Sequence, residues 1–490
     1  MQKTFSAFTV ALALLTTQVA RANLTLPSVI GSHMVLQRGQ AVPIWGWASP
    51  GEKISVTFAG QMQSATAGAD GSWKVSLAPL PTSATPTDLV IAGSETVTLT
   101  NVLVGEVWFC SGQSNMEKPI GDHKGQKPVF NAEQELASGD QFPLIRLYRA
   151  MDHIATNTPQ RTAKGDWSVC SSNALATKDF SAAGYFFGRE IFQALSNVPI
   201  GLVESAWGGT RIEPWTPRVG FAAVPSLAAL ADYKIPEHKT AATNPVALFN
   251  GMIAPIAPFA IRGALWYQGE SNCMGTEDGM AYADKMRALV GGWRKIWAQG
   301  DFAFYFVQIA PFRYFSDPKT PRVKSPDALP EFWEAQAASL AIKNTGMIVT
   351  TDITDDVKDI HPRNKLDVGK RLALVALAKT YGRPVEFSGP VFRKAETRGD
   401  KIILSFNHAA GLRAQDGQSL NWFTIAGADG IFSTAKAEIS GAQIIVSSPD
   451  VKRPRAARFA WHELATPNLV NSAGLPCVPF RTDDAKTMRR

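Results

Sequence analysis

The chain has 490 residues, 45% of them hydrophobic and 19% charged, which allows a large buried core and roughly two to four folding units. Its formal charge is +7, and no run of Lys and Arg forms the basic stripe of a nucleic-acid-binding protein, so we expect no nucleic-acid partner. The four cysteines include no C-x-x-C pair, which argues against a zinc or redox site. Whether they form disulfides or stay as buried thiols is left open.

The N-terminus has the pattern of a signal peptide. A positive charge at Lys3 precedes an apolar run over residues 7–15, and the small residues Ala20 and Ala22 give a cleavage pattern. The apolar run is too short for a membrane anchor, which is the alternative interpretation. We therefore predict a cleaved signal peptide over residues 1–22, export to the periplasm or the medium, and no membrane insertion.

Residues 23–104 are predicted to form an N-terminal β domain. Short runs with strand patterning are separated by Gly-containing turns, and this spacing indicates a small β-sandwich. The strands are expected at Val42–Trp47, Ile54–Phe58 and Trp73–Leu77.

Residues 105–382 change to a rhythm of strand, loop and helix. Buried parallel strands are expected at 106–110, 199–204, 263–267, 302–309 and 347–351. One helix is expected to be capped by Asp179 or Ser181, a second to carry the apolar face from Met286 to Trp297, and a third to begin at Pro362. The alternation predicts an α/β layered domain with a mainly parallel sheet.

Strand patterns return over residues 383–490, at 401–406, 422–425 and 444–446. We predict a C-terminal β domain there. The sequence leaves open whether it packs against the N-terminal one.

Polar motifs follow four of the predicted parallel strands. They are Ser111–Met116, Trp207–Thr210, Gln268–Asn272 and Asp359–Pro362. In an open α/β sheet, ligands bind beyond the carboxyl ends of the strands, so all four motifs should meet at one edge. Taken singly, each motif has a plainer interpretation as a polar turn or a helix cap.

Together the motifs supply the groups that acyl transfer needs. A serine hydroxyl becomes a nucleophile when a base takes its proton, and a carboxylate can orient an imidazole base. We predict that Ser114 attacks, that His361 is the base and that Asp359 orients it. Asp355 and Asp356 lie close by in the sequence, so the orienting carboxylate is less well defined than the other two groups.

Donors for the developing oxyanion are predicted from the same motifs. They are the backbone N–H groups of Ser114 and of Gly208 or Gly209, and the side-chain amide of Gln268. Asn272 is the reserve donor and is also considered a substrate contact.

These residues carry a resemblance to a known family. The strings WFCSGQSNM (108–116), WGGT (207–210), WYQGESN (266–272) and DIHPRNK (359–365) resemble the sialate O-acetylesterases. That family belongs to the SGNH hydrolases, so the resemblance implies a flavodoxin-like three-layer fold and a metal-free esterase that needs no cofactor. Ser114 and His361 match its nucleophile and base. The common SGNH patterns Gly-Asp-Ser and Asp-x-x-His are altered, because Gln113 precedes the serine and Lys358 stands three residues before the histidine.

Substrate contacts are predicted beside these motifs. The aromatic residues Trp207, Trp215, Trp266 and Tyr267 are each as well explained by sugar stacking as by core packing. A sialate carboxylate would need a cation, for which Arg211 and Arg363 are candidates, although either could form a structural ion pair instead.

Two functional hypotheses follow. The first is a carbohydrate O-acetylesterase, acting on acetylated sialic acid or alternatively on a plant polysaccharide such as xyloglucan or xylan. The second is a non-catalytic carbohydrate-binding protein. A lipase or peptidase is less well supported, because the chain lacks a G-x-S-x-G elbow. The oligomeric state is left open.

Overall fold

The computed structural model describes residues 24–483, apart from 237, 239, 275–278, 318 and 320. The predicted signal peptide lies outside the described residues. Within the described part of the chain, no helix combines the length and the apolar character needed to cross a membrane.

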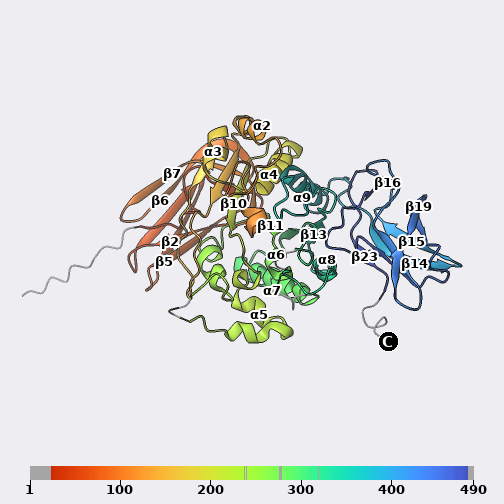
Figure 1. The fold of residues 1–490 in the computed structure, drawn as a ribbon. Helices are drawn as coiled ribbons and strands as arrows, with labels where there is room; N and C mark the ends of the chain where they lie inside the picture. Colours follow the sequence, from red (N-terminus) through yellow and green to blue (C-terminus); the bar gives the residue numbers. More distant parts are fainter. Residues whose placement is uncertain are drawn as a thin grey trace, which may run out of the picture.

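A large, mostly parallel sheet forms the centre of the molecule (Figure 1). Its strand order is β13-β12-β11-β7-β10-β8-β9, and every neighbouring pair is parallel except β8 and β9. The strands are β7 (Thr96–Gly112), β8 (Ile145–Arg149), β9 (Trp167–Val169), β10 (Ile200–Ala206), β11 (Gly263–Tyr267), β12 (Ala303–Val307) and β13 (Thr345–Ile348). All five predicted strands are present, and β8 and β9 extend the sheet beyond the prediction.

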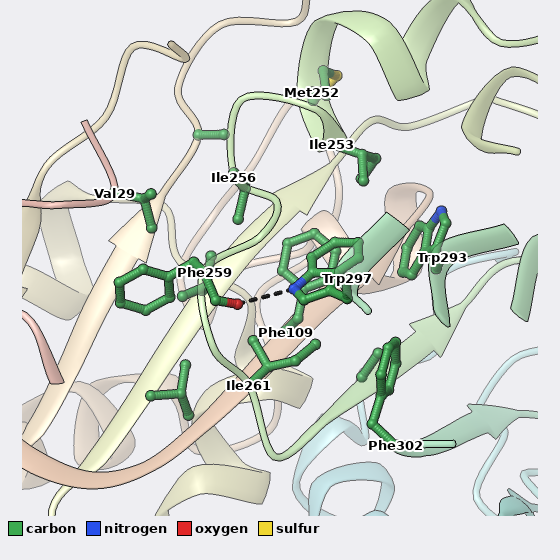
Figure 2. Packing of buried hydrophobic residues seen from close by; sticks show 14 of the residues in the cluster. Val29, Phe109, Met252, Ile253, Ile256, Phe259, Ile261, Trp293, Trp297 and Phe302 are labelled. Carbon is green, nitrogen blue, oxygen red and sulfur yellow. Dashed lines mark hydrogen bonds between the residues drawn. The ribbon is translucent and has the colours of Figure 1, made fainter. Parts of the chain in front are cut away.

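Helices cover both faces of this sheet. On one face α4 (Ala182–Ala194) packs against α9 (Lys365–Lys379), and on the other lies α7 (Ala281–Trp297), flanked by α5 (Arg218–Ala222) and α8 (Ala328–Ala338). Successive residues of β7 point to opposite faces, as the strand pleat requires. Trp108 packs against Phe187 of α4, whereas Phe109 contacts Trp293 and Trp297 of α7 with ring centroids 5.4 and 5.6 Å apart (Figure 2). The predicted three-layer α/β architecture is confirmed.

The structure defines the starts of two helices. The sequence left the cap of the first open and placed the start of the second too early. Ser181, not Asp179, caps α4, because its Oγ accepts the backbone N–H of Gly184 at 3.0 Å. Helix α9 begins at Lys365 rather than at Pro362, because Asn364 caps it by accepting the N–H of Asp367 at 3.1 Å. The segment between them stays a loop, and this loop carries His361.

The N-terminal β region consists of a ribbon and a sheet. Strands β2 (Val42–Trp47) and β5 (Ser72–Leu77) pair with each other, while β4 (Gln61–Thr66), β3 (Lys53–Phe58), β6 (Ser83–Ala92) and the first half of β7 form the sheet, with β1 (Val35–Gln37) also on β7. Strand β7 then runs without a break into the central sheet. The predicted division at residue 104 therefore falls inside one strand, and it remains a prediction.

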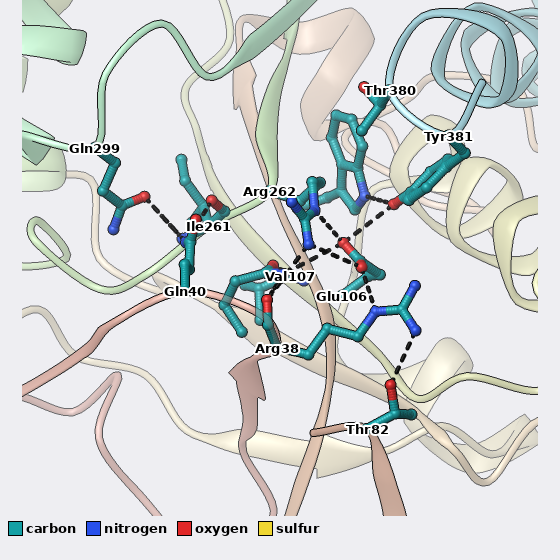
Figure 3. Close-up of polar contacts among 12 residues, drawn as sticks. Arg38, Gln40, Thr82, Glu106, Val107, Ile261, Arg262, Gln299, Thr380 and Tyr381 are labelled. Carbon is teal, nitrogen blue, oxygen red and sulfur yellow. Dashed lines mark hydrogen bonds and ion pairs between the residues drawn. The ribbon is translucent and has the colours of Figure 1, made fainter. Parts of the chain in front are cut away.

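A buried carboxylate fixes β7 near this transition. Glu106 binds Arg38 and Arg262 through contacts of 2.5 and 2.6 Å, and it accepts the hydroxyl of Tyr381 at 3.2 Å (Figure 3). These partners come from the segments after β1, before β11 and after α9. The cluster therefore joins the N-terminal β region to the α/β layers, at the opposite end of the central strands from Ser114.

The C-terminal β region lies at the far side of the α/β layers from the N-terminal one (Figure 1), so the two β regions do not pack together. Its sheets have the orders β14-β15-β20-β19 and β18-β17-β21-β23, with β16 and β22 forming a separate pair. The strands are β14 (Val391–Arg398), β15 (Lys401–Asn407), β16 (Arg413–Ala414), β17 (Phe423–Ala426), β18 (Phe432–Thr434), β19 (Lys436–Ser440), β20 (Gln443–Ser447), β21 (Ala456–Phe459), β22 (Leu469–Val470) and β23 (Phe480–Arg481). A hydrophobic core of its own, from Ile402 to Phe480, holds this region together.

All four cysteines are buried, and each has a free thiol and not a disulfide. Burial raises the pKa of the Cys170 thiol to about 12 and those of Cys110 and Cys477 well above their ordinary value. Of the alternatives that the sequence left open, the structure has buried thiols.

Candidate active site

The turn that carries Ser114, the predicted nucleophile, lies at the carboxyl end of β7. The strand ends at Gly112, Gln113 is extended, and the short helix α1 (Ser114–Glu117) begins at the serine. Gly112 has φ of +145°, and a Cβ there would lie 2.1 Å from the carbonyl oxygen of Tyr267. Only glycine fits so close to the neighbouring strand β11. The turn therefore presents Ser114, which is partly exposed, at the edge where the four motifs were expected to meet.

The structure brings Ser114 and His361 together. The Nε2 atom of His361 lies 2.9 Å from Oγ of Ser114, a hydrogen-bond distance suited to proton transfer. Asp359 is also present, and its Oδ1 accepts the backbone N–H of His361 at 2.9 Å. The same oxygen is 3.7 Å from Nδ1 of the imidazole, which is too far for a hydrogen bond.

The surroundings of His361 favour its neutral form. Burial lowers the pKa of His361 most, the nearby cation Lys365 lowers it further, and Asp359 opposes both; the resulting pKa is about 4. A neutral imidazole can accept a proton, so His361 is in the base form at neutral pH.

The two glycines after β10 have different environments. The N–H of Gly208 donates to Oε2 of Glu117 at 2.8 Å, so it already has an acceptor. Gly209 is exposed, has φ of +75° and has open space where a side chain would be. The N–H of Gly209 donates no hydrogen bond to a backbone or side-chain group of any described residue.

The amide of Gln268 is buried and fully engaged. Its Nε2 donates to Oδ1 of Asn272 at 2.8 Å and to the carbonyl of Thr210 at 3.1 Å, and its oxygen accepts the hydroxyl of Tyr282 at 2.8 Å. Asn272 in turn donates to Glu213 at 3.1 Å. Gln268 and Asn272 therefore link the motifs after β10 and β11, and neither amide N–H points freely into the site. The oxyanion role predicted for Gln268 would require it to give up one of these bonds.

Sequence reasoning missed the charged cluster around Glu117. This carboxylate, 3% exposed, contacts Lys124 at 2.8 Å and His153 at 3.2 Å. Burial works to raise the pKa of Glu117, but the hydrogen bonds from His153 and Lys124 outweigh it and lower the pKa to about 2. The His153 ring also stacks on Trp207, with centroids 4.7 Å apart. The signal available in the sequence was the position of Glu117, three residues after Ser114.

A second missed group is a polar network beneath the Ser114–His361 pair. Asn115, Glu270 and Lys365 are all buried, with relative exposures of 0, 1 and 0%. Lys365 donates to Oδ1 of Asn115 at 2.7 Å, and Nδ2 of Asn115 donates to Glu270 at 2.5 Å and to the carbonyl of Ile360 at 2.9 Å. Each residue belongs to one of the motif strings, which was the signal in the sequence.

The two predicted arginines differ in availability. Arg363 donates through Nε to the carbonyl of Pro128 at 2.9 Å, and its guanidinium lies 4.5 Å from the ring centre of Phe130. Arg211 is exposed and makes no ion pair or side-chain hydrogen bond with any described residue.

The four aromatic residues predicted as substrate contacts also differ in their exposure. Trp215, Trp266 and Tyr267 are buried in the core, with exposures of 0, 1 and 0%. Core packing therefore explains these three. Trp207, which is partly exposed beside Gly208, is the one aromatic residue of the four that a ligand can reach.

Comparison with known proteins identifies the family. Residues 104–378 match the family model described as "Carbohydrate esterase, sialic acid-specific acetylesterase", which covers more than half of the chain. The chain belongs to this carbohydrate esterase family. The match contains all four motifs, and it confirms the resemblance and the enzyme class, carboxylic ester hydrolysis, that the sequence predicted.

Individual relatives agree with this family assignment. The human sialate O-acetylesterase is 31% identical over 424 residues, which are 79% of this chain and 77% of the relative, and the rat enzyme is 30% identical over 455 residues, 80% of each. A carbohydrate acetylesterase from Xanthomonas citri has a similar structure, with a TM-score of 0.83 and 35% identity over 94% of this chain and 100% of that one. The similarity to these esterases thus extends well beyond the α/β region.

Proposed function

We propose that this esterase removes O-acetyl groups from carbohydrates, most favourably from acetylated sialic acid, with Ser114 as nucleophile and His361 as general base. The 2.9 Å contact between Ser114 Oγ and His361 Nε2, at an edge open to solvent, is the observation that carries the proposal. The reaction is acyl transfer to the serine followed by hydrolysis.

In the first step, Nε2 of His361 takes the proton from Ser114 as Oγ attacks the acetyl carbonyl. The imidazolium then returns the proton to the departing sugar oxygen, which leaves an acetylated serine. In the second step His361 activates a water, which releases acetate and restores Ser114. Because the pKa of His361 is lowered to about 4, the base is ready over the neutral range.

The oxyanion is proposed to form near the start of α1. Ser114 is the first residue of that helix, so its N–H has no intrahelical acceptor. Of the two glycines, Gly209 is the better second donor, because Gly208 is bound to Glu117. Gln268 is the third proposed donor, provided that it exchanges a bond to Thr210 or Asn272 for one to the substrate.

The sialate preference is supported by relatives and by Arg211. The family description and the mammalian relatives both name sialate esters. Arg211, exposed next to Thr210, is suited to a sugar carboxylate, and Trp207 offers a ring nearby. Acetylated plant polysaccharide is the alternative substrate, because the similar Xanthomonas citri protein is described only as a carbohydrate acetylesterase, which fits either class of sugar.

The test is acetate release by wild type and Ser114→Ala on 9-O-acetylated sialic acid and on acetylated xyloglucan fragments. We expect release by wild type, faster on the sialate, and a loss of at least about 10³-fold in the variant. Faster release from xyloglucan would transfer the preference to the polysaccharide. Activity retained by Ser114→Ala would overturn the proposed mechanism.

Export is proposed from the N-terminal pattern alone, with residues 1–22 as the signal peptide. N-terminal sequencing of protein isolated from the host should give a chain that begins near Asn23. An intact N-terminus that begins at Met1 would contradict it.

A further inference from the structure

The hydrogen bonds around His361 leave open what aligns its ring with Ser114. The carboxylate of Asp359 is bonded to the backbone N–H of His361, and it does not hydrogen-bond the imidazole. This bond lies within the loop after β13, so it shapes the loop but does not attach it to the nucleophile. A separate contact must set the position of the loop relative to α1.

Asn115 makes such a contact. One N–H of its amide donates to the carbonyl of Ile360, the residue before His361, at 2.9 Å. Asn115 itself follows Ser114 in α1. The bond therefore joins the residue after the nucleophile to the residue before the base, and it connects α1 to the loop after β13, two segments far apart in the sequence.

The other atoms of the Asn115 amide are used as well. Its second N–H donates to Glu270, the first residue of α6 (Glu270–Cys273), and its oxygen accepts from Lys365, the first residue of α9. Both N–H groups and the oxygen of the amide thus have partners, which fixes the orientation of the side chain. One buried residue connects the segments that follow β7, β11 and β13.

We propose that Asn115 is the positioning residue of this active site: its bond to the Ile360 carbonyl, held in place by Glu270 and Lys365, aligns the His361 imidazole with Ser114. The inference rests on the proposed roles of Ser114 and His361. Asn115 does not touch the substrate in this scheme and acts through the loop. Its loss should lower kcat and leave KM nearly unchanged, because ground-state binding does not depend on the alignment.

The test compares alanine variants of two buried asparagines in the full-length chain. Asn115→Ala should lower kcat for p-nitrophenyl acetate by about 100-fold, as expected for a displacement of about 1 Å in the base, with KM within about twofold. Asn471→Ala is the matched control. Its amide also donates to two carbonyls, those of Ser388 and His408 at 2.9 and 3.1 Å, but it lies in the C-terminal β region. The control should lose thermal stability and keep its kcat.

A double variant separates the loop contact from the buried charges. Asn115→Asp with Glu270→Gln exchanges the amide and the carboxylate, so that Lys365 keeps an acid partner and the two side chains can still hydrogen-bond each other. The Ile360 carbonyl, however, loses its donor. We expect this variant to regain thermal stability relative to Asn115→Ala while its kcat stays low.

Two results would overturn the inference: a kcat within about threefold of wild type in Asn115→Ala, or full recovery of kcat in the double variant. If Asn115→Ala does not fold, the double variant alone decides. Ser114→Ala is measured in parallel. An active Ser114→Ala would refute the proposed function itself, whereas an inactive Ser114→Ala beside an active Asn115→Ala would refute only the role of Asn115.

Discussion

Oδ1 of Asp359 accepts the backbone N–H of His361 at 2.9 Å but lies 3.7 Å from Nδ1 of the same residue. The carboxylate is therefore bound to the loop more firmly than to the imidazole ring. In a serine triad, the corresponding carboxylate bonds directly to Nδ1 and fixes the tautomer. In the proposed mechanism Asp359 therefore acts on the ring mainly through its charge, which raises the pKa of His361 and would stabilise the imidazolium that forms during attack.

This geometry predicts a modest effect of Asp359→Asn. The new amide oxygen can still accept the backbone N–H, so only the charge is lost, and we expect kcat to fall about 10-fold instead of the about 10⁴-fold known for a triad carboxylate. The comparison is Asp355→Asn, because Oδ1 of Asp355 accepts the backbone N–H of Arg363 at 3.2 Å; it should cost no more than about twofold. A loss near 10⁴-fold in Asp359→Asn would mean that the carboxylate turns onto Nδ1 during catalysis.

The pH profile should respond to Lys365. The proposed mechanism requires neutral His361, so kcat/KM should fall as the pH drops through the pKa of His361, which is about 4. After burial, Lys365 is the largest cause of that low value; Lys118 and His123 add to it, and Asp359 opposes it. Lys365→Met removes a cation, so the pKa of His361 should rise and the acid limb should move to higher pH, by roughly one unit.

Lys379→Met is the matched control for this experiment. Lys379 ends the helix that Lys365 begins, and its Nζ donates to the carbonyl of Thr345 at 2.7 Å, at the opposite end of β13 from the site. The acid limb of the kcat/KM profile of Lys379→Met should match that of wild type. A shift of Lys365→Met to lower pH, or an equal shift in both variants, would show that the charge of Lys365 does not act on His361.

The sequence was sufficient to predict the layers and the meeting of Ser114 with His361, for physical reasons. Strands buried on both faces, such as the region around Trp108 and Phe109, are apolar throughout and stand out from helices with one apolar face. Strand β8 was missed because Arg146 and Arg149 stand among its apolar residues, and β9 was missed because it has only three residues. Ser114 and His361 could be paired because parallel strands end at one edge of the sheet.

Side-chain partners were harder to predict. Nothing in the string from Trp207 to Thr210 indicates that Gly208 is bound to Glu117, because that contact depends on how two loops meet. Gln268 was assigned an oxyanion role from its residue type, yet its amide is bonded within the protein. The start of α9 was misplaced because Pro362 suits the first position of a helix, while the Asn364 cap decides where the helix begins.

Glu117 should stabilise the fold in a pH-dependent way. Its pKa is about 2 in the folded chain, below the ordinary value of 4.5, so its contribution is complete above about pH 4.5 and is lost as the pH falls toward 2. The shift corresponds to about 3 kcal/mol at neutral pH. Glu117→Gln should lower the free energy of unfolding by up to that amount at pH 7, and the difference from wild type should shrink below pH 4.5.

Urea unfolding followed by tryptophan fluorescence measures this difference at each pH. Glu396→Gln serves as the control, because Glu396 is exposed and pairs at 3.0 Å with Arg398, two residues further along the same strand. Glu396→Gln should change the free energy of unfolding very little at any pH. If the two variants lose the same stability, or if the loss in Glu117→Gln does not depend on pH, the carboxylate charge is not what stabilises the cluster.

Arg211 should discriminate between acidic and neutral substrates. It is exposed beside the Gly208–Gly209 turn, and no ion pair with a described residue competes for its guanidinium. A charge-assisted bond to the sialate carboxylate is worth about 1.5–3 kcal/mol, or about 10- to 100-fold in affinity. Arg211→Ala should therefore raise KM for 9-O-acetylated sialic acid by at least about 10-fold, and KM for p-nitrophenyl acetate, which has no carboxylate, by less than about twofold.

Arg218→Ala is the control for this prediction. Arg218 is also exposed, and its NH1 donates to the carbonyl of Ala231 at 2.6 Å; its replacement should leave both KM values unchanged. Equal effects of Arg211→Ala on the two substrates would exclude a carboxylate contact and would favour a neutral polysaccharide as the substrate.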